Sequence, residues 1–203
     1  MATICNLVIK IAYLPNMGIL RIRISATGNN RETLAAEVAT VKQQIKTVVG
    51  IKYIFGTKND TIEQVIGDSL IAQNAKMAIA ESCTGGRIAH QLTLKAGCSQ
   101  YFKGGLVAYA NEIKQNFLGV KAVTLEKYGA VSEQTVAEMA LGIIQKFDVD
   151  YSLAISGIAG PGGGTTEKPV GTIWIAVANR SKVYTRMFTF ARTRDVNILL
   201  TSK

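Results

Sequence analysis

Short apolar segments alternate with longer segments of helical periodicity along most of the chain, and this alternation constrains the fold more than any other feature. The apolar segments predict strands; they cover residues 77–80, 106–109 and 153–156. The segments between them predict helices; they cover residues 61–73, 85–94, 132–147 and the stretch that begins near Thr193. Helices that alternate with short apolar strands are typical of an α/β fold, and we expect a layered α/β/α sandwich around a central sheet.

Two local patterns extend this prediction. Residues 172–177 and 182–190 predict a hairpin that turns over residues 179–181. Ser132 favours the capping position of a helix and Glu133 its first turn. We therefore expect a hairpin after the last apolar strand and a long helix that begins at Ser132.

The first part of the chain follows a different pattern. Residues 20–25 alternate strictly between apolar and polar side chains, which is typical of a half-buried strand. Residues 10–14 predict a short strand before Pro15, and residues 53–55 predict another. Residues 31–49 predict an amphipathic helix, because apolar side chains recur three and four residues apart. The pattern predicts a small β-β-α-β domain.

A polar break over residues 56–60 separates this piece from the rest of the chain. We expect the small domain at residues 1–57 and the main domain at residues 58–203. The last expected helix is still in progress at Lys203, so we expect the chain to be truncated there.

The composition is that of a globular protein, with 48% apolar and 18% charged residues. No apolar stretch approaches the roughly 18 residues of a membrane helix, and the N-terminus lacks the pattern of a secretory signal. Cys5, Cys83 and Cys98 are an odd number without a Cys-x-x-Cys pair, which suits a reducing compartment. We expect a soluble, cytoplasmic protein without a membrane partner.

The positive charge is concentrated near the N-terminus. The net charge is +9, and residues 1–58 hold eight Lys or Arg and two Asp or Glu. Such an excess can bind nucleic acid or another polyanion, but a solvated basic helix face is the interpretation we favour.

His90 is the single histidine, and no spacing of zinc ligands is recognisable. We expect no metal and no cofactor.

A candidate nucleophile lies where an expected strand meets an expected helix, in Glu81-Ser82-Cys83-Thr84-Gly85-Gly86. A serine at such a turn lies beside backbone N–H groups that can stabilise an oxyanion or bind a phosphate. A plain turn in which Thr84 caps the helix is the alternative.

If Ser82 is a nucleophile, it needs a base. His90 lies eight residues further along the same expected helix, about 12 Å away, and is a poor candidate. A desolvated lysine can be neutral and act as a base. Lys114 is the best placed lysine, because it follows the strand at residues 106–109 by one turn, with Tyr109 close by. A solvated helix lysine is the alternative.

A second glycine-rich segment, residues 156–164, directly follows an expected strand. Such a loop can surround a phosphate with backbone N–H groups. It lacks the Gly-Lys-Ser/Thr of a Walker loop. A mobile surface loop is the alternative, but a phosphorylated substrate would explain both glycine-rich segments.

Four blocks resemble the CinA C-terminal family, in order from about residue 59 to the end; they are residues 80–86, 102–114, 128–132, and 156–161 together with 168–172. Members of that family include deamidases that convert nicotinamide mononucleotide to nicotinate mononucleotide and ammonia. The resemblance implies a metal-free amidohydrolase of pyridine nucleotide salvage that forms a homodimer. It implies Ser82 as the nucleophile, Lys114 as its activating partner and Tyr109 as an assisting group. The substrate-binding residues that it implies are Glu81, Cys83, Thr84, Gly85, Gly86, Ser156, Gly157, Ile158, Ala159, Gly160 and Arg194.

The N-terminal piece is similar to the KH-type middle domain of full-length CinA proteins at residues 12–15 and 21–24. It lacks the Gly-x-x-Gly loop with which KH modules clamp RNA. We therefore expect weak nucleic-acid binding or none. The alternative function is a nucleic-acid-associated module of competence or damage response, in which the C-terminal domain is a dimerising scaffold without catalysis.

Overall fold

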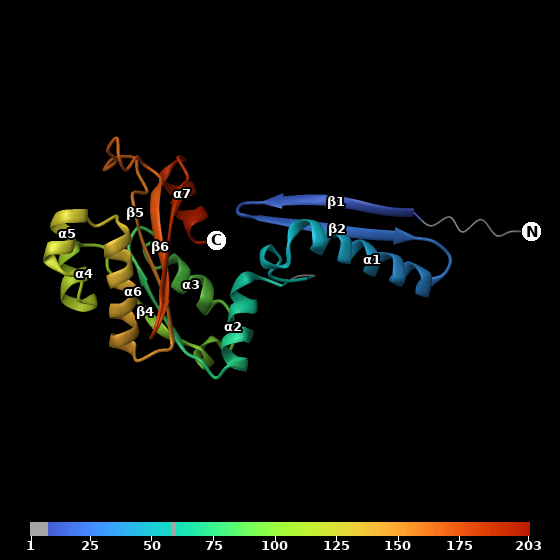
Figure 1. The fold of residues 1–203 in the computed structure, drawn as a ribbon, viewed down its shortest axis with the longest axis horizontal. Coiled ribbons are helices and arrows are strands. Elements are labelled where there is room, and N and C mark those ends of the chain that lie inside the picture. Colours follow the sequence, from blue (N-terminus) through green and yellow to red (C-terminus); the bar gives the residue numbers. More distant parts are fainter. Residues whose placement is uncertain (1–7, 58–59) are drawn as a thin grey trace, which may run out of the picture. The chain divides into compact units, whose positions relative to one another are not determined.

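The computed structural model describes residues 8–57 and 60–203, which form two compact units (Figure 1). The first unit ends at Ile62 and the second runs from Glu63 to Ser202. The domain boundary predicted between residues 57 and 58 borders a stretch outside the described residues, and it remains a prediction. Cys5 also lies outside the described residues.

The first unit is a hairpin covered by one helix. Strands β1 (Val8–Asn16) and β2 (Ile19–Thr27) pair antiparallel, and helix α1 (Arg31–Val49) packs on β2. The side chain of Asn30 caps α1, accepting from the N–H groups of Glu32 and Thr33. The predicted helix at residues 31–49 is confirmed. No residue in the described range 8–57 is buried, so this unit has only a thin apolar layer.

Two predictions for this unit are wrong. Residues 53–55 form no strand; a single 3-10 turn, η1 (Ile51–Tyr53), takes their place, because Tyr53 N–H and Ile54 N–H donate to the nearby carbonyls of Gly50 and Ile51. The unit is therefore β-β-α. Pro15 lies inside β1 instead of ending it, since a strand that pairs on one side alone tolerates a residue without an N–H.

The second unit is built on a five-stranded mixed sheet. Its order is β4-β3-β5-β6-β7. Three strands are parallel, and they are β3 (Met77–Glu81), β4 (Phe102–Val107) and β5 (Tyr151–Gly157). The expected hairpin, β6 (Thr172–Asn179) and β7 (Val183–Thr189), continues the sheet antiparallel. Every residue of β3 is buried, as expected for a strand covered on both faces.

The predicted strand at residues 106–109 is displaced, because β4 ends at Val107. The first half of β4 was not predicted as a strand because it contains Gly104 and Gly105, and glycine is uncommon in strands. A Cβ at Gly105 would lie 2.8 Å from Cγ1 of Ile79 on β3, so the neighbouring strand fills the space that a side chain would occupy.

Helices cover both faces of the sheet, which confirms the layered α/β/α prediction. One side carries α4 (Asn111–Leu118), α5 (Ala122–Tyr128) and α6 (Glu133–Phe147). The other carries α2 (Ile62–Ala72), α3 (Arg87–Thr93), the 3-10 turn η2 (Cys98–Gln100) and α7 (Arg194–Thr201). Two separate apolar clusters fill these layers, and Figure 1 shows α6 and α3 on opposite sides of the strands. No helix in the described ranges is long and apolar enough to cross a membrane.

The strand order indicates which edge of the sheet is expected to bind a ligand. The chain leaves β3, forms β4 on one side of it, and returns to form β5 on the other side. In open α/β sheets such a reversal opens a crevice at the carboxyl ends of the strands, and ligands bind there. The residues that directly follow the three parallel strands at this edge are Ser82 after β3, Ala108 after β4 and Ile158 after β5.

We expect Gly142→Ala to destabilise the second unit by about 1–3 kcal/mol or more, through overpacking. A Cβ at Gly142 in α6 would lie 1.8 Å from the carbonyl oxygen of Leu118, at the end of α4. Gly162→Ala is the control, because a Cβ there meets nothing within 4 Å and the change should stay within about 0.5 kcal/mol. Urea unfolding measures both, and equal effects would contradict the close approach of α4 and α6.

Candidate active site

Ser82 and Lys114 meet at the carboxyl edge of the sheet. Ser82 follows β3 directly, and its N–H donates to the carbonyl of Ile155 at 3.0 Å, which extends the parallel ladder by one residue. Lys114 projects from α4, and its Nζ donates to Ser82 Oγ at 3.2 Å. The same Nζ donates to the carbonyls of Ala108 and Tyr109, both at 2.8 Å. The structure thus brings together the nucleophile and the base that the sequence predicts.

Lys114 is suited to losing its proton. Its side chain is 1% exposed, and burial lowers the pKa of the Lys114 amine, an effect that the neighbouring Cys83 thiol opposes. Carbonyl oxygens only accept hydrogen bonds. A neutral Lys114 would therefore donate its two N–H groups to Ala108 and Tyr109 and direct its lone pair at Ser82 Oγ. In that state the lone pair of Lys114 is positioned to accept the hydroxyl proton of Ser82.

Cys83, the nucleophilic residue type next to Ser82, is held in its thiol form. Burial raises the pKa of the Cys83 thiol to about 11, and the thiolate is the reactive species. Its side chain belongs to an apolar cluster with Ile155 and Ile173. A Cβ at Gly157 would lie 3.0 Å from Cys83 Sγ, so the glycine lets β5 pass close to it. The structure places Cys83 as a packing residue.

Glu81, predicted to contact substrate, binds the start of α3. Its carboxylate is 1% exposed, and it accepts from the N–H groups of Gly86 and Ile88 at 3.1 Å and of Ala89 at 2.7 Å. These donors at the N-terminus of α3 therefore already have a carboxylate partner. The alternative in which Thr84 caps the helix is wrong, because α3 begins after Gly86.

Thr84 offers hydrogen-bonding groups to a ligand. Its side chain is buried, and in the described part of the chain its Oγ1 has no hydrogen-bond partner. A buried hydroxyl without a partner is costly unless a ligand or water satisfies it. The backbone N–H groups of Cys83 and Thr84 also donate to no backbone carbonyl among the described residues. These groups are the candidates for stabilising an oxyanion.

Arg194 connects three separate segments at this edge. Its Nη2 donates to Tyr109 Oη at 3.0 Å, and its Nη1 donates to the carbonyl of Gly160 at 2.6 Å. Tyr109 is 59% exposed, and its backbone carbonyl is one of the acceptors of Lys114. The start of α7, the glycine-rich segment and the stretch after β4 therefore meet at Arg194, and Tyr109 joins them to Lys114.

The first half of the glycine-rich segment is fixed by the protein itself. Ser156 Oγ donates to the carbonyl of Ala130 at 2.7 Å. Ile158 pairs with the segment before β6, because its N–H donates to Thr172 and its carbonyl accepts from Gly171. Residues 161–167 are exposed. The hydroxyl hydrogen of Ser156, a predicted binding residue, is therefore already used in a hydrogen bond within the protein.

The structure adds a residue that the sequence analysis missed. Asn197 is buried on α7 and binds the carbonyl of Ala159 as well as the backbone of Arg192. An asparagine in an amphipathic helix carries no sequence signal for this role.

His90 lies exposed on α3. Within the described ranges, no group of three or more His, Cys, Asp or Glu could hold a metal ion.

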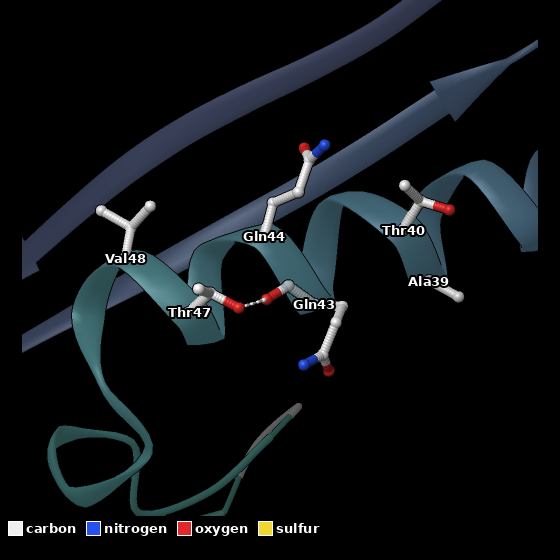
Figure 2. Close-up of a pocket in the computed structure, with 6 residues that line it drawn as sticks. All are labelled: Ala39, Thr40, Gln43, Gln44, Thr47 and Val48. Carbon is white, nitrogen blue, oxygen red and sulfur yellow. Dashed lines mark hydrogen bonds between the residues drawn. The ribbon is translucent and has the colours of Figure 1, made fainter.

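A separate hollow is lined by residues of the first unit alone. It has a volume of about 570 Å³ and runs along α1; Figure 2 shows its lining residues, Ala39, Thr40, Gln43, Gln44, Thr47 and Val48. All six come from one helix, where Thr47 Oγ1 donates to the carbonyl of Gln43. Val48 is 87% exposed. The convex surface of a single helix cannot enclose a ligand, so we assign no site there.

The second unit is thus defined as a layered α/β domain with a serine–lysine pair at the carboxyl ends of its parallel strands. The CinA C-terminal domain matches residues 59–202. The chain belongs to the CinA family, as the four sequence blocks predict.

Relatives in sequence carry the family name. The chain is 48% identical over 194 residues to a CinA-like protein from Cytophaga hutchinsonii, covering 95% of this chain and 46% of that protein. It is 41% identical over 189 residues to a CinA-like protein from Salinibacter ruber, covering 93% of this chain and 45% of that protein. The chain spans about half the length of the curated relatives it matches.

Solved structures resemble the second unit. The crystal structure of the competence/damage inducible protein CihA from Agrobacterium tumefaciens matches with a TM-score of 0.67 and 39% identity, over 69% of this chain and 86% of that one. A CinA superfamily protein from Escherichia coli matches with a TM-score of 0.65 and 35% identity, over 73% of this chain and 92% of that one. The similarity of the first unit to a KH-type domain remains a prediction.

We expect Glu81→Gln to destabilise the protein by about 1–3 kcal/mol, because the amide group would turn N–H donors toward backbone N–H groups that lose their acceptor. Activity should fall with it, since the turn that carries Ser82 is fastened to α3 by this carboxylate. Glu126→Gln, on the exposed face of α5, is the control. Thermal unfolding measures both variants, and equal melting temperatures would refute the capping role of Glu81.

Proposed function

We propose that this protein is a metal-independent serine–lysine amidohydrolase that converts nicotinamide mononucleotide to nicotinate mononucleotide and ammonia, in pyridine nucleotide salvage. The observation that carries the proposal is the contact between Ser82 Oγ and the buried amine of Lys114. The family resemblance supports the substrate and a homodimer, and the odd number of cysteines without a Cys-x-x-Cys pair supports a cytoplasmic location.

The reaction follows from the geometry of this pair. Lys114 accepts the hydroxyl proton of Ser82 while Oγ forms a bond to the carboxamide carbon. The C–N bond then breaks, and ammonia leaves with the proton that Lys114 returns. The acyl group is then bound to Ser82 Oγ as an ester. A water molecule, deprotonated by Lys114, attacks this ester; the C–Oγ bond breaks and Oγ takes the proton back from Lys114. The acid product loses its own proton to solvent as the carboxylate. Each half-reaction thus moves one proton to and from the same amine.

Stabilisation of the oxyanion is assigned to the turn after Ser82. The N–H groups of Cys83 and Thr84 lack backbone acceptors, and the Thr84 hydroxyl is buried without a partner in the described part of the chain. Fixed donors of this kind stabilise a developing negative charge without reorganisation. The phosphate is assigned to Arg194 and the glycine-rich segment, which meet at Gly160.

A second candidate function rests on the first unit. Lys10, Arg21 and Arg23 lie on one face of the β1–β2 hairpin by their register, all three are exposed, and residues 8–27 hold no carboxylate. Such a face attracts polyanions. A nucleic-acid-associated role of this unit is therefore the alternative.

We expect Ser82→Ala to abolish ammonia release from nicotinamide mononucleotide while the fold is retained, because the nucleophilic oxygen is lost. Cys83→Ala, one residue away, should keep most of the activity, since a buried thiol with a raised pKa takes no part in the reaction. The assay is ammonia release with circular dichroism as the check on folding. Activity that depends on Cys83 instead of Ser82 would reverse the assignment.

We expect kcat/KM to rise with pH as Lys114 loses its proton. The pKa of the Lys114 amine is lowered by burial, so the neutral base is present below the usual range of a lysine. Lys114→Ala should lower kcat by about 100-fold to 10,000-fold and remove this limb of the profile. Lys114→Arg should be nearly as damaging, because a guanidinium stays protonated. An active Lys114→Arg variant would show that a positive charge suffices.

We expect the full chain to bind a single-stranded RNA or DNA probe weakly, and only at low salt, through the exposed cations of the hairpin. Arg21→Ala with Arg23→Ala should remove this binding without changing ammonia release. Fluorescence anisotropy across a salt series is the measurement. Tight binding that survives about physiological salt would favour the alternative function.

A further inference from the structure

Asn197 is a fully buried polar residue within a short helix. Its side chain is 0% exposed. Its Nδ2 donates to the carbonyls of Ala159 at 3.0 Å and of Arg192 at 2.8 Å, and its Oδ1 accepts from the N–H of Arg192 at 3.0 Å. Both donor hydrogens of the carboxamide are thus engaged, together with one acceptor site. The amide fastens α7 to the glycine-rich segment.

These bonds flank the contact that Arg194 makes. Ala159 directly precedes Gly160, whose carbonyl accepts from Arg194 Nη1. Arg192 lies two residues before Arg194, and it follows Ala191, whose φ of 47° is unfavourable for a residue with a Cβ. Such a conformation persists where the surroundings hold it. Asn197 therefore fixes the backbone on both sides of the contact between Arg194 and Gly160.

Arg194 retains hydrogen-bonding capacity for a ligand. A guanidinium has five N–H donors in a fixed plane, and the contacts with Gly160 and Tyr109 engage two of them. The remaining donors suit the oxygens of a phosphate, which pairs with arginine in bidentate fashion. Such recognition depends on geometry, and a displacement of about 1 Å can lower activity about 100-fold.

We propose that Asn197 is a positioning residue that holds Arg194 and the segment at Ala159–Gly160 in place for the phosphate of the substrate. The inference rests on the proposed function and extends it to the discrimination between phosphorylated and unphosphorylated substrates. Asn197 acts through Arg194 and touches no reacting atom.

The test compares Asn197→Asp with a matched asparagine. Asn197→Asp keeps the shape and the acceptor, but it turns an oxygen toward the carbonyls of Ala159 and Arg192. Asn179→Ala is the control: Asn179 also makes three hydrogen bonds, to Ser181 and Lys182, at the β6–β7 turn. That turn lies at the opposite end of β6 from the site. If Asn197→Asp does not fold, Asn197→Ser retains one donor and serves instead.

Two measurements are made on each folded variant. Steady-state ammonia release gives kcat and KM with nicotinamide mononucleotide and with unphosphorylated nicotinamide riboside. We expect Asn197→Asp to raise KM for the mononucleotide about 10-fold to 100-fold and to leave kcat/KM for the riboside nearly unchanged. Asn179→Ala should lower the melting temperature and leave the ratio between the two substrates as in the wild type.

Calorimetric binding of inorganic phosphate separates this inference from the proposed function. Absence of ammonia release by the wild type would refute the proposed function, whereas phosphate affinity tests Asn197 directly. Arg194→Ala combined with Asn197→Asp should bind phosphate no more weakly than Arg194→Ala alone, because one residue acts through the other. Unchanged phosphate affinity in Asn197→Asp, or equal losses for both substrates, would overturn the inference.

Discussion

The burial of the Lys114 amine is the constraint on which the site depends. An amine taken out of water needs partners for its hydrogens, and the charged form is disfavoured there. The end of β4 supplies two of these partners, the carbonyls of Ala108 and Tyr109, and the end of β3 supplies Ser82 as the third. Since the two carbonyls can only accept, Ser82 is the one of these three partners with which the amine could exchange a proton. The parallel arrangement of the strands thus brings the amine and the hydroxyl into contact.

Glu81 and Ser82, two consecutive residues at the end of β3, contact helices on opposite faces of the sheet. Side chains alternate along a strand, so Glu81 points toward α3 while Ser82 points toward α4 and Lys114. The carboxylate of Glu81 accepts three backbone N–H groups of the turn and of α3. It thereby fixes the start of the turn. Because these N–H groups already donate to Glu81, they are not available to bind another anion. The N–H groups of Cys83 and Thr84, which donate to no backbone carbonyl among the described residues, remain for the oxyanion of the proposed reaction.

The sequence predicted the layers and the helix at residues 31–49, because periodicity reports burial directly. The family resemblance singled out Ser82 and Lys114, whose side chains lie 3.2 Å apart in the structure, and their roles stay a prediction. It did not predict that residues 53–55 form no strand, since short apolar runs pair only where a neighbouring strand is available. The partners of Glu81 were also hidden. A carboxylate in a glycine-rich turn looks the same in sequence whether it faces a ligand or a helix. Asn197 escaped detection because its three bonds join residues that only the fold brings together.

Tyr109 links Arg194, the proposed phosphate-binding residue, to Lys114, the proposed base. Its hydroxyl accepts from Arg194, and its backbone carbonyl accepts from Lys114. A phosphate that draws on the donors of Arg194 therefore acts on a residue whose main chain helps to hold the base. The contact of Arg194 with Gly160 ties the same residue to the glycine-rich segment. Binding of the distant phosphate and alignment of the amine with Ser82 are for this reason expected to vary together, whereas a truncated substrate leaves Arg194 with the protein's own acceptors only.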